Sequence, residues 1–362
     1  MSPEVTVVIP TRDRKRLVLR ALRSALAQHG ATVQAVVVDD GSVDGTAAAV
    51  AAAHPEVRLI RHDQALGSSV ARNVGIEAAR TPWVAFLDDD DVWAPGKLAA
   101  QLAALAQPRV DGGRARWACC SAVLLDAADR LIGWNPVRGG EVDLGGLLIE
   151  NRVPGGGSSV VADRKLLAAV GGFADIEHSE DWDLWIRLAQ EAGNAVAVAQ
   201  PLVGYRVWMS SSSRIEGLEA DWHLVLGRHA ELTARMRVPP DQLALHRYRA
   251  FRAMHSRHFR EAATSMFRVA RLQRSPKSAA MALAVRIGGS ACFPLWSKLN
   301  GGRVPAEVRA ETERWMALLT EGPEPSGAGV GPGLSEGAGD RGGETDRGAV
   351  VLDVVDSRYK AR

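Results

Sequence analysis

The chain has few cysteines, little net charge and no long uncharged apolar run, and each shortage excludes a class of protein. Three cysteines among 362 residues, two of them adjacent at Cys119 and Cys120, cannot form a disulfide framework, so a reducing compartment is expected. A formal net charge of +2 gives no general reason to expect nucleic acid as a partner. The stretch closest to a membrane-spanning helix, 279–296, contains Arg286 and falls short of the roughly 18 uncharged apolar residues required.

Several nucleotide-binding and hydrolase signatures are also missing. No Gly-Lys-Ser/Thr follows the glycines of GGGSS, no G-x-G-x-x-G opens a helix after the first strand, and no G-x-S-x-G elbow occurs. The nine histidines have no metal-ligand spacing. The amino terminus, MSPEVTVVIPTRDR, enters an apolar strand without a charged leader or cleavage site, so we expect a cytoplasmic protein. Neither P-loop hydrolysis nor dinucleotide redox chemistry is expected.

What the sequence does contain is an alternation of β-branched runs and helical segments from residue 5 to about 90. Strands are predicted at 5–10, 33–40, 57–60 and 83–87, and helices at 14–28, 46–53 and 69–79. This alternation predicts an α/β fold with a mostly parallel central sheet and helices on both faces. Ligands of such sheets bind beyond the carboxyl ends of the strands.

The rest of the chain is mainly helical. A helix is predicted from about Glu180 to Glu191 with Ser179 as its N-cap, and the chain reads as helix from about residue 215. The basic stretch 246–277 holds nine Lys or Arg residues against one acid, Glu261. It favours a helical hairpin with a solvated basic face over attachment to an anionic membrane surface. The Gly- and Glu-rich tail, 322–362, is predicted to be mostly disordered.

Four consecutive carboxylates, Asp88–Asp91 in FLDDDDVW, follow the fourth strand. Two carboxylates separated by one residue at the end of a buried strand can bind a hard divalent cation and leave positions open for phosphate oxygens. A cation there would neutralise a diphosphate leaving group. The alternative is a solvated acidic turn before the next helix.

Polar residues also follow the other strands and open a later helix. Asp39 and Asp40 can accept hydrogen bonds from a base or a ribose hydroxyl, or can form an Asx turn. In SEDWDLW, Glu180, Asp181 and Asp183 could include a general base, or could only complement the dipole of a helix N-terminus.

Taken in order, VVIPTRDR, VVVDDGSVDGT, ARNVGIEAARTPWVAFLDDDDVWAPGKL, VGGF and EDWDLWIRLA resemble glycosyltransferase family 2 with the GT-A fold, over roughly residues 4–213. The resemblance implies an inverting transfer from a nucleotide-diphosphate sugar to an acceptor hydroxyl of a glycan or glycolipid, with Mn²⁺ or Mg²⁺. It implies a domain at 1–214, with a nucleotide-binding half at about 1–92 and an acceptor half at about 93–214. A helical region, 215–321, and the tail would follow.

The resemblance also assigns roles to individual residues. On the donor side it implies that Thr11 and Arg12 line the nucleotide pocket, that Asp39 or Asp40 holds the base near Arg72, and that Asp88, Asp90 and Asp91 form the acidic motif. Asp90 is the expected metal ligand, Asp88 the expected partner of the ribose and a second metal candidate, and Asp91 the acid that follows. On the acceptor side it implies Asp181 as general base and Glu180 as the residue that orients the acceptor.

One departure stands out: Trp208 occupies the place of a histidine found after YR in many relatives. We therefore expect Arg206 and the serines Ser210–Ser213 to contact phosphate instead. Abundant Ala, Arg and Gly indicate a GC-rich bacterial genome and hence surface polysaccharide or glycolipid synthesis. The alternatives are a nucleotidyltransferase, or a non-catalytic nucleotide- or glycan-binding protein with a helical interaction module.

Overall fold

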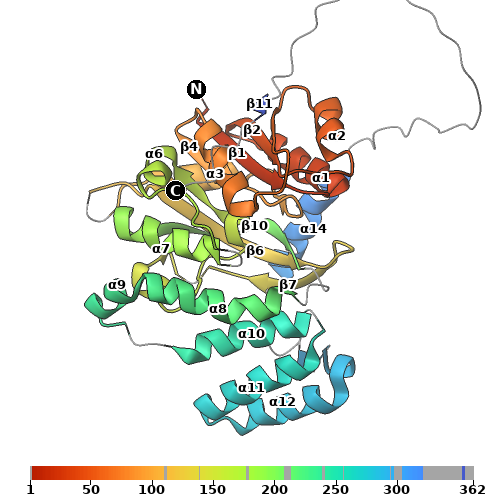
Figure 1. Ribbon diagram of the computed structural model, residues 1–362, viewed down its shortest axis with the longest axis vertical. Coiled ribbons are helices and arrows are strands. Elements are labelled where there is room, and N and C mark those ends of the chain that lie inside the picture. The colour runs from red at the N-terminus through yellow and green to blue at the C-terminus, as the bar shows by residue number, and fades with distance from the viewer. Residues whose placement is uncertain are drawn as a thin grey trace, which may run out of the picture.

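The structure is a computed structural model that describes residues 2–109, 112–137, 139–176, 179–207, 213–238, 241–255, 257–293, 295–296, 304–320 and 353–354. A central sheet with helices on both faces forms one part, and a group of helices lies below it in Figure 1. The α/β class predicted from the sequence is confirmed.

The first half of the sheet is parallel, as the alternating pattern predicts. Strands β1 (Glu4–Thr11), β2 (Thr32–Asp39), β3 (Arg58–Arg61) and β4 (Trp83–Phe86) take the order β3-β2-β1-β4. Helices α1 (Lys15–Leu26), α2 (Thr46–Ala53) and α3 (Ser68–Ala78) connect them. In β1, Val7 packs into the hydrophobic cluster on one face and Val8 into the cluster on the other, which is why the strand is almost continuously apolar.

The second half makes the sheet mixed rather than mostly parallel. Strand β9 (Val161–Asp163) lies antiparallel between β4 and β6 (Trp117–Leu125), and β10 (Ala195–Arg206) is parallel to β6. Three short strands pair antiparallel to these two: β5 (Val92–Trp93), β7 (Leu131–Asn135) and β8 (Glu141–Val142). The predictions came from local alternation, which carries no information on strand direction in this half.

Helices cover both faces of the sheet. On one face, α1, α4 (Lys97–Ala106) and α14 (Ala306–Thr320) contribute Leu22, Leu98 and Trp315 to a shared cluster. On the other, α3, α6 (Arg164–Ala169) and α7 (Glu180–Ala192) surround Phe86 and Trp185. The short elements α5 (Leu144–Leu147) and η1 (Gly156–Ser159) lie in the connections between strands. The predicted helix from Glu180 is confirmed.

The carboxyl-terminal helices are α8 (Ser213–Arg228), α9 (Ala230–Arg235), α10 (Gln242–His255), α11 (Phe259–Gln273) and α12 (Pro276–Gly288), followed by η2 (Gly289–Cys292). Helices α10 to α12 enclose a third hydrophobic cluster around Met254 and Met266. The basic stretch 246–277 is therefore a helical hairpin, as predicted. Helix α14 returns to the sheet, where it contributes Val308 and Trp315 to the hydrophobic cluster on one face.

Two further observations concern the ends of the chain and the membrane. The tail predicted to be disordered lies outside the described residues, apart from β11 (Asp353–Val354), which pairs with β3. Within the described ranges, we find no helix whose length and apolar character would let it cross a bilayer.

Candidate active site

The carboxyl ends of the parallel strands bring the predicted polar residues to one edge of the sheet. Thr11 ends β1 and lies in register with Asp39, which ends β2. Asp88–Asp91 follow β4, which pairs with β1 on the other side. The Thr11 hydroxyl donates to Asp89 Oδ2 at 2.8 Å. Residues 78 positions apart in the chain thus meet directly.

Arg14 neutralises part of the acidic cluster. Its Nη1 lies 2.9 Å from Asp89 Oδ1 and 2.8 Å from Asp90 Oδ2. Burial, together with the neighbouring Asp90 charge, nevertheless raises the pKa of Asp89 to about 6. Both carboxylate oxygens of Asp89 therefore already bind groups of the protein, Thr11 and Arg14.

Asp91 holds loops together. Its Oδ2 accepts a hydrogen bond from the Ser158 hydroxyl at 2.6 Å, and its Oδ1 accepts from the Arg206 backbone N–H at 2.8 Å. The residue is 1% exposed, and burial with the charges of Asp90 and Asp88 raises its pKa well above the usual range. This arrangement favours a structural role for Asp91, tying η1 to β10, over the predicted metal role.

Asp88 and Asp90 are the more exposed members of the cluster, with 25% and 13% of their side chains accessible. They supply hard oxygen donors separated by one residue. Within the described part of the chain, no group of three or more His, Cys, Asp or Glu side chains is placed to hold a metal ion. Mg²⁺ is commonly bound by one or two carboxylates together with substrate phosphates, so this pair fits a cation completed by the donor.

Arg72 joins the acidic cluster to the helix that carries the predicted base. Its Nη2 lies 2.7 Å from Asp88 Oδ1, and its Nη1 lies 2.8 Å from Glu180 Oε1. The guanidinium also stacks over Phe173, 5.2 Å from the ring centroid. Glu180, expected to orient the acceptor, is therefore also the counterion of Arg72.

Asp181 lies at the first turn of α7, beside a glycine-rich loop. Its Oδ2 accepts from Asn151 Nδ2 at 3.3 Å, and a Cβ added at Gly156 would stand 3.4 Å from the same oxygen. Gly156 has a φ of +54°, so a side chain there would be both strained and close to the carboxylate. Burial and the adjacent Glu180 charge raise the pKa of Asp181 to about 7. A carboxyl group with that pKa can accept a proton near neutral pH.

The two aspartates after β2 have different surroundings. Asp40 accepts from His62 Nδ1 at 2.8 Å and from the backbone N–H groups of Leu66 and Gly67 at 2.8 and 2.9 Å. Asp39 accepts from the Ser42 N–H at 3.0 Å, and its buried Oδ2 has no hydrogen-bond partner among the described residues, although Arg61 Nε lies 3.5 Å away. Asp39 is thus the one with acceptor capacity left for a ligand.

Of the two arginines expected to contact the donor, Arg12 is exposed and Arg206 is hydrogen-bonded to other groups of the protein. The Arg12 side chain is 59% exposed and lies 3.7 Å from Asp13 Oδ2. Arg206 donates from Nε to the Asp90 carbonyl at 3.0 Å, from Nη1 to the Asp126 carbonyl at 2.9 Å, and from Nη2 to Asp129. These contacts favour a structural role for Arg206. Trp208 and Ser210–Ser212 lie outside the described residues, as does the side chain of Ser213.

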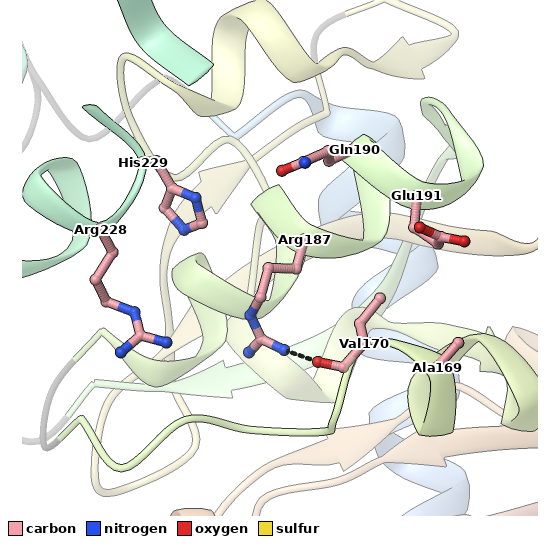
Figure 2. A pocket seen from close by; sticks show the side chains of 7 residues that line it. All are labelled: Ala169, Val170, Arg187, Gln190, Glu191, Arg228 and His229. Carbon is pink, nitrogen blue, oxygen red and sulfur yellow. Dashed lines mark hydrogen bonds between the residues drawn. The ribbon is translucent and has the colours of Figure 1, made fainter. Parts of the chain in front are cut away.

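Asp183, the third acid of SEDWDLW, belongs to a different cluster. Its side chain is 0% exposed and pairs with Arg187, Arg228 and His229 at 2.7, 3.0 and 3.0 Å. These three residues also line a pocket of about 450 Å³ between α6, α7 and the α8–α9 junction, drawn in Figure 2. None of the predicted site residues lines it. The cluster ties α7 to the carboxyl-terminal helices.

Three contacts of the site were not predicted: Arg14, Ser158 and Asn151. Arg14 stands in TRDR, two residues after Arg12, and Ser158 in GGGSS, which the sequence presents only as a loop. Trp93 Nε1 donates to the Ser158 carbonyl at 2.8 Å and so fixes the loop.

The sheet and the acidic residues at its strand ends define a GT-A-like α/β protein. Residues 6–122 match the model of Glycosyl transferase family 2, so this segment is similar to that family. It is 48% identical over 114 residues to the succinoglycan biosynthesis protein ExoO of Rhizobium meliloti, covering 30% of this chain and 33% of that one. It is 26% identical over 234 residues to an Escherichia coli protein, the UDP-Glc:alpha-D-GlcNAc-diphosphoundecaprenol beta-1,3-glucosyltransferase WfgD, covering 63% of this chain and 87% of that one.

Among solved structures, the mannosyltransferase PcManGT from Pyrobaculum calidifontis in complex with GDP-Man and Mn²⁺ is 20% identical, with a TM-score of 0.46, and covers 88% of this chain and 87% of that one. The chain spans 33% and 62% of the length of the first two curated relatives it matches.

Proposed function

We propose that the protein is an inverting glycosyltransferase that moves a sugar from a nucleotide-diphosphate donor to an acceptor hydroxyl. The observation that supports this best is the connection from Asp88 through Arg72 to Glu180, next to Asp181. It relates the partly exposed carboxylates of Asp88 and Asp90 to a carboxyl group whose pKa is about 7, which supports one shared site. The match of residues 6–122 to the model of Glycosyl transferase family 2 supports the same reaction.

In the proposed reaction, Asp181 accepts the proton of the acceptor hydroxyl while that oxygen forms a bond to the anomeric carbon. The bond from the anomeric carbon to the diphosphate oxygen breaks, and the nucleoside diphosphate leaves with the electron pair. A single in-line displacement of this kind inverts the configuration. Asp88 and Asp90 would hold Mg²⁺ or Mn²⁺, which supplies charge neutralisation for the leaving diphosphate.

Donor recognition rests on the carboxyl ends of β1 and β2. Asp39 Oδ2 is buried and keeps acceptor capacity, so it suits an N–H of the base. Asp40 is saturated by three donors and instead fixes the loop before α3. We therefore choose Asp39 over Asp40 as the base-binding residue, with Thr11 beside it.

The biological setting is proposed from the relatives. Their names place them in succinoglycan synthesis and in transfer to a diphosphoundecaprenol-linked sugar, so bacterial polysaccharide synthesis with a lipid-carried acceptor suits this chain. Such an acceptor lies at a membrane, which supports a cytoplasmic protein bound peripherally to the inner face of the cell membrane.

Helix α12 is the surface best suited to that contact, rather than the whole of 246–277. Leu283 and Ile287 are 52% and 79% exposed and lie four residues apart, while Ala282 and Val285 are buried against α11. Lys277 and Arg286 flank the exposed stripe, and Glu261 is the one acid between residues 259 and 296. An apolar stripe with basic flanks is the pattern of a helix lying in the surface of an anionic bilayer.

The test of the reaction is a thermal-shift panel of UDP, GDP, dTDP, CDP and ADP and their sugar conjugates with Mn²⁺, Mg²⁺ or EDTA. A ligand that binds only the native state raises the melting temperature. We expect a metal-dependent shift with one nucleotide that disappears in Asp90→Ala and survives in Asp181→Asn. No shift with any nucleotide would overturn the proposal and favour a non-catalytic protein, and pyrophosphate release from a nucleoside triphosphate would favour a nucleotidyltransferase.

A further inference from the structure

Arg252 on helix α10 contacts Tyr205 of β10, the residue before Arg206. The Nε atom of Arg252 is buried and has no hydrogen-bond partner among the described residues. Within the same residues, no carboxylate forms an ion pair with it. Arg249, one turn earlier on the same helix, instead pairs with Glu219.

The position of Arg252 is fixed by aromatic residues. Its guanidinium lies within hydrogen-bonding reach of the Tyr205 side chain on β10, with Tyr248 also close. Tyr248 packs on Trp222 with ring centroids 6.2 Å apart, and Trp222 packs on Trp182 at 4.5 Å. Trp182 follows Asp181 in α7, so this row of rings fixes α10 relative to the proposed base.

Tyr205, which contacts Arg252, also lies near Asp181. A Cβ added at Gly156 would lie 3.9 Å from Tyr205 Cε2 and 3.4 Å from Asp181 Oδ2, so ring and carboxylate flank the same glycine. The next residue, Arg206, donates its backbone N–H to Asp91. Tyr205 thus has Arg252 as one neighbour and lies beside the same glycine as Asp181.

The guanidinium of Arg252 contacts Tyr205, and its buried Nε atom has no hydrogen-bond partner among the described residues. Removing a cation from water without a partner costs several kcal/mol, and other buried arginines of the protein, such as Arg72 and Arg206, do have carboxylate partners. Arg is also the side chain best shaped to bind phosphate through two parallel hydrogen bonds. The structure thus offers a phosphate position distinct from Asp88 and Asp90.

We propose that Arg252 binds a phosphate group carried by the acceptor, as in an acceptor sugar linked through a diphosphate. This inference rests on the proposed transferase function, because Asp181 defines the acceptor side. The donor diphosphate is expected at Asp88 and Asp90, where Arg14 and Arg72 already supply positive charge. Tyr205 is a positioning residue that directs the guanidinium of Arg252.

The test measures binding of inorganic pyrophosphate by calorimetry in EDTA, without nucleotide, to the full chain. We expect wild-type protein to bind, Arg252→Gln to bind at least tenfold more weakly, and the ion-paired control Arg249→Gln to bind like wild type. The metal-dependent shift of Arg252→Gln with the donor nucleotide should be unchanged.

Two results would overturn the proposal: equal pyrophosphate affinity in wild type and Arg252→Gln, or loss of the donor-nucleotide shift in Arg252→Gln, which would place Arg252 at the donor. If Arg252→Gln does not fold, Arg252→Lys retains the charge but not the paired donors and should bind pyrophosphate more weakly than wild type. If geranyl diphosphate binds more tightly than pyrophosphate, the acceptor is lipid-linked. If the two bind equally, the phosphate belongs to a soluble acceptor. Failure of every donor nucleotide in wild type would instead count against the transferase function.

Discussion

Arg72 and Glu180 form an ion pair of 2.8 Å across 108 positions of the chain, and Arg72 also holds Asp88 at 2.7 Å. One side chain thereby connects the strand end that carries the acidic motif to the helix that carries the proposed base. Because the Arg72 side chain is 9% exposed, neither carboxylate can readily replace it with water.

Replacing Arg72 with Met should lower both activity and stability. Loss of the guanidinium leaves Asp88 and Glu180 without their counterion, so we expect the free energy of unfolding to fall by about 3 kcal/mol and kcat to fall on the order of 100-fold. Denaturant unfolding and transfer kinetics measure the two effects. Arg72→Lys keeps the charge but cannot bridge both carboxylates, so its stability and kcat should lie between those of wild type and Arg72→Met. A wild-type kcat in Arg72→Met would show that Arg72 does not act in the site.

Asp181 should impose a pH dependence on the reaction. Only the carboxylate form can accept a proton, and its pKa is raised to about 7, so the rate should rise with pH through about 7 and level off above it. Asp181→Asn should lower kcat by at least about 100-fold while the donor-nucleotide shift persists. A pH–rate profile under saturating donor tests the first statement, and a flat profile from pH 5 to 8 would contradict it.

Asp183 should contribute to stability at neutral pH and lose that contribution in acid. Burial raises its pKa, but the hydrogen bond from His229 and the charges of Arg187 and Arg228 outweigh burial and lower the pKa to about 2. The stabilisation is therefore complete above pH 4 and is lost as the pH falls toward 2. Asp183→Asn should reduce the free energy of unfolding at pH 7 by about 3 kcal/mol. The variant should also lose less stability than wild type as the pH falls from 4 toward 2.

The matched control for Asp183 is Glu191→Gln, which changes an exposed acid lining the same pocket. It should alter the free energy of unfolding by less than about 0.5 kcal/mol. Equal losses in the two variants would mean that the pocket as a whole, rather than the buried ion cluster, stabilises the protein.

Lys97 should destabilise the protein at neutral pH. It is 0% exposed, its Nζ has no hydrogen-bond partner among the described residues, and it lies 3.9 Å from the centroid of the Trp93 ring. Burial lowers the pKa of Lys97 to about 8, whereas its ordinary value is 10.5. Between these two pH values the unfolded chain binds more protons than the folded protein, so stability should rise with pH across that window. Lys97→Met should abolish the rise and raise the free energy of unfolding at pH 7 by about 2 kcal/mol. Exposed Lys165 provides the control, and a loss of stability in Lys97→Met would show that the contact with Trp93 outweighs burial.

Helix α12 should determine binding to anionic membranes. Changing Ile287 to Ser removes the most exposed apolar side chain of the stripe, and we expect at least threefold weaker co-sedimentation with phosphatidylglycerol vesicles, with the donor-nucleotide shift unchanged. Val43, which is 90% exposed and lies in the loop before α2, supplies the control Val43→Ser. Equal sedimentation of all three proteins would assign the contact elsewhere.

The sequence alone determined the elements up to about residue 87, their order and the helix from Glu180. The boundaries of α2, α7 and β1 follow from apolar periodicity and from strand and helix composition, which act over a few residues. The order of acidic and basic groups along the motifs is equally local, and it was enough to predict that Asp39 and Asp88–Asp91 follow the second and fourth strands. Parallel strands then require these residues to share an edge of the sheet.

Only the tertiary structure decided what each of those residues does. Arg14 reaches Asp89 across 75 positions, Ser158 reaches Asp91 across 67, and Asp39 differs from Asp40 because donors 22 to 27 positions later saturate only the second. The direction of β9 and the approach of Arg252 to Tyr205 also depend on packing between distant segments. Spacing along the chain sets which groups are present, whereas burial and pairing of charges, which depend on the whole fold, set which of them are left to bind a ligand.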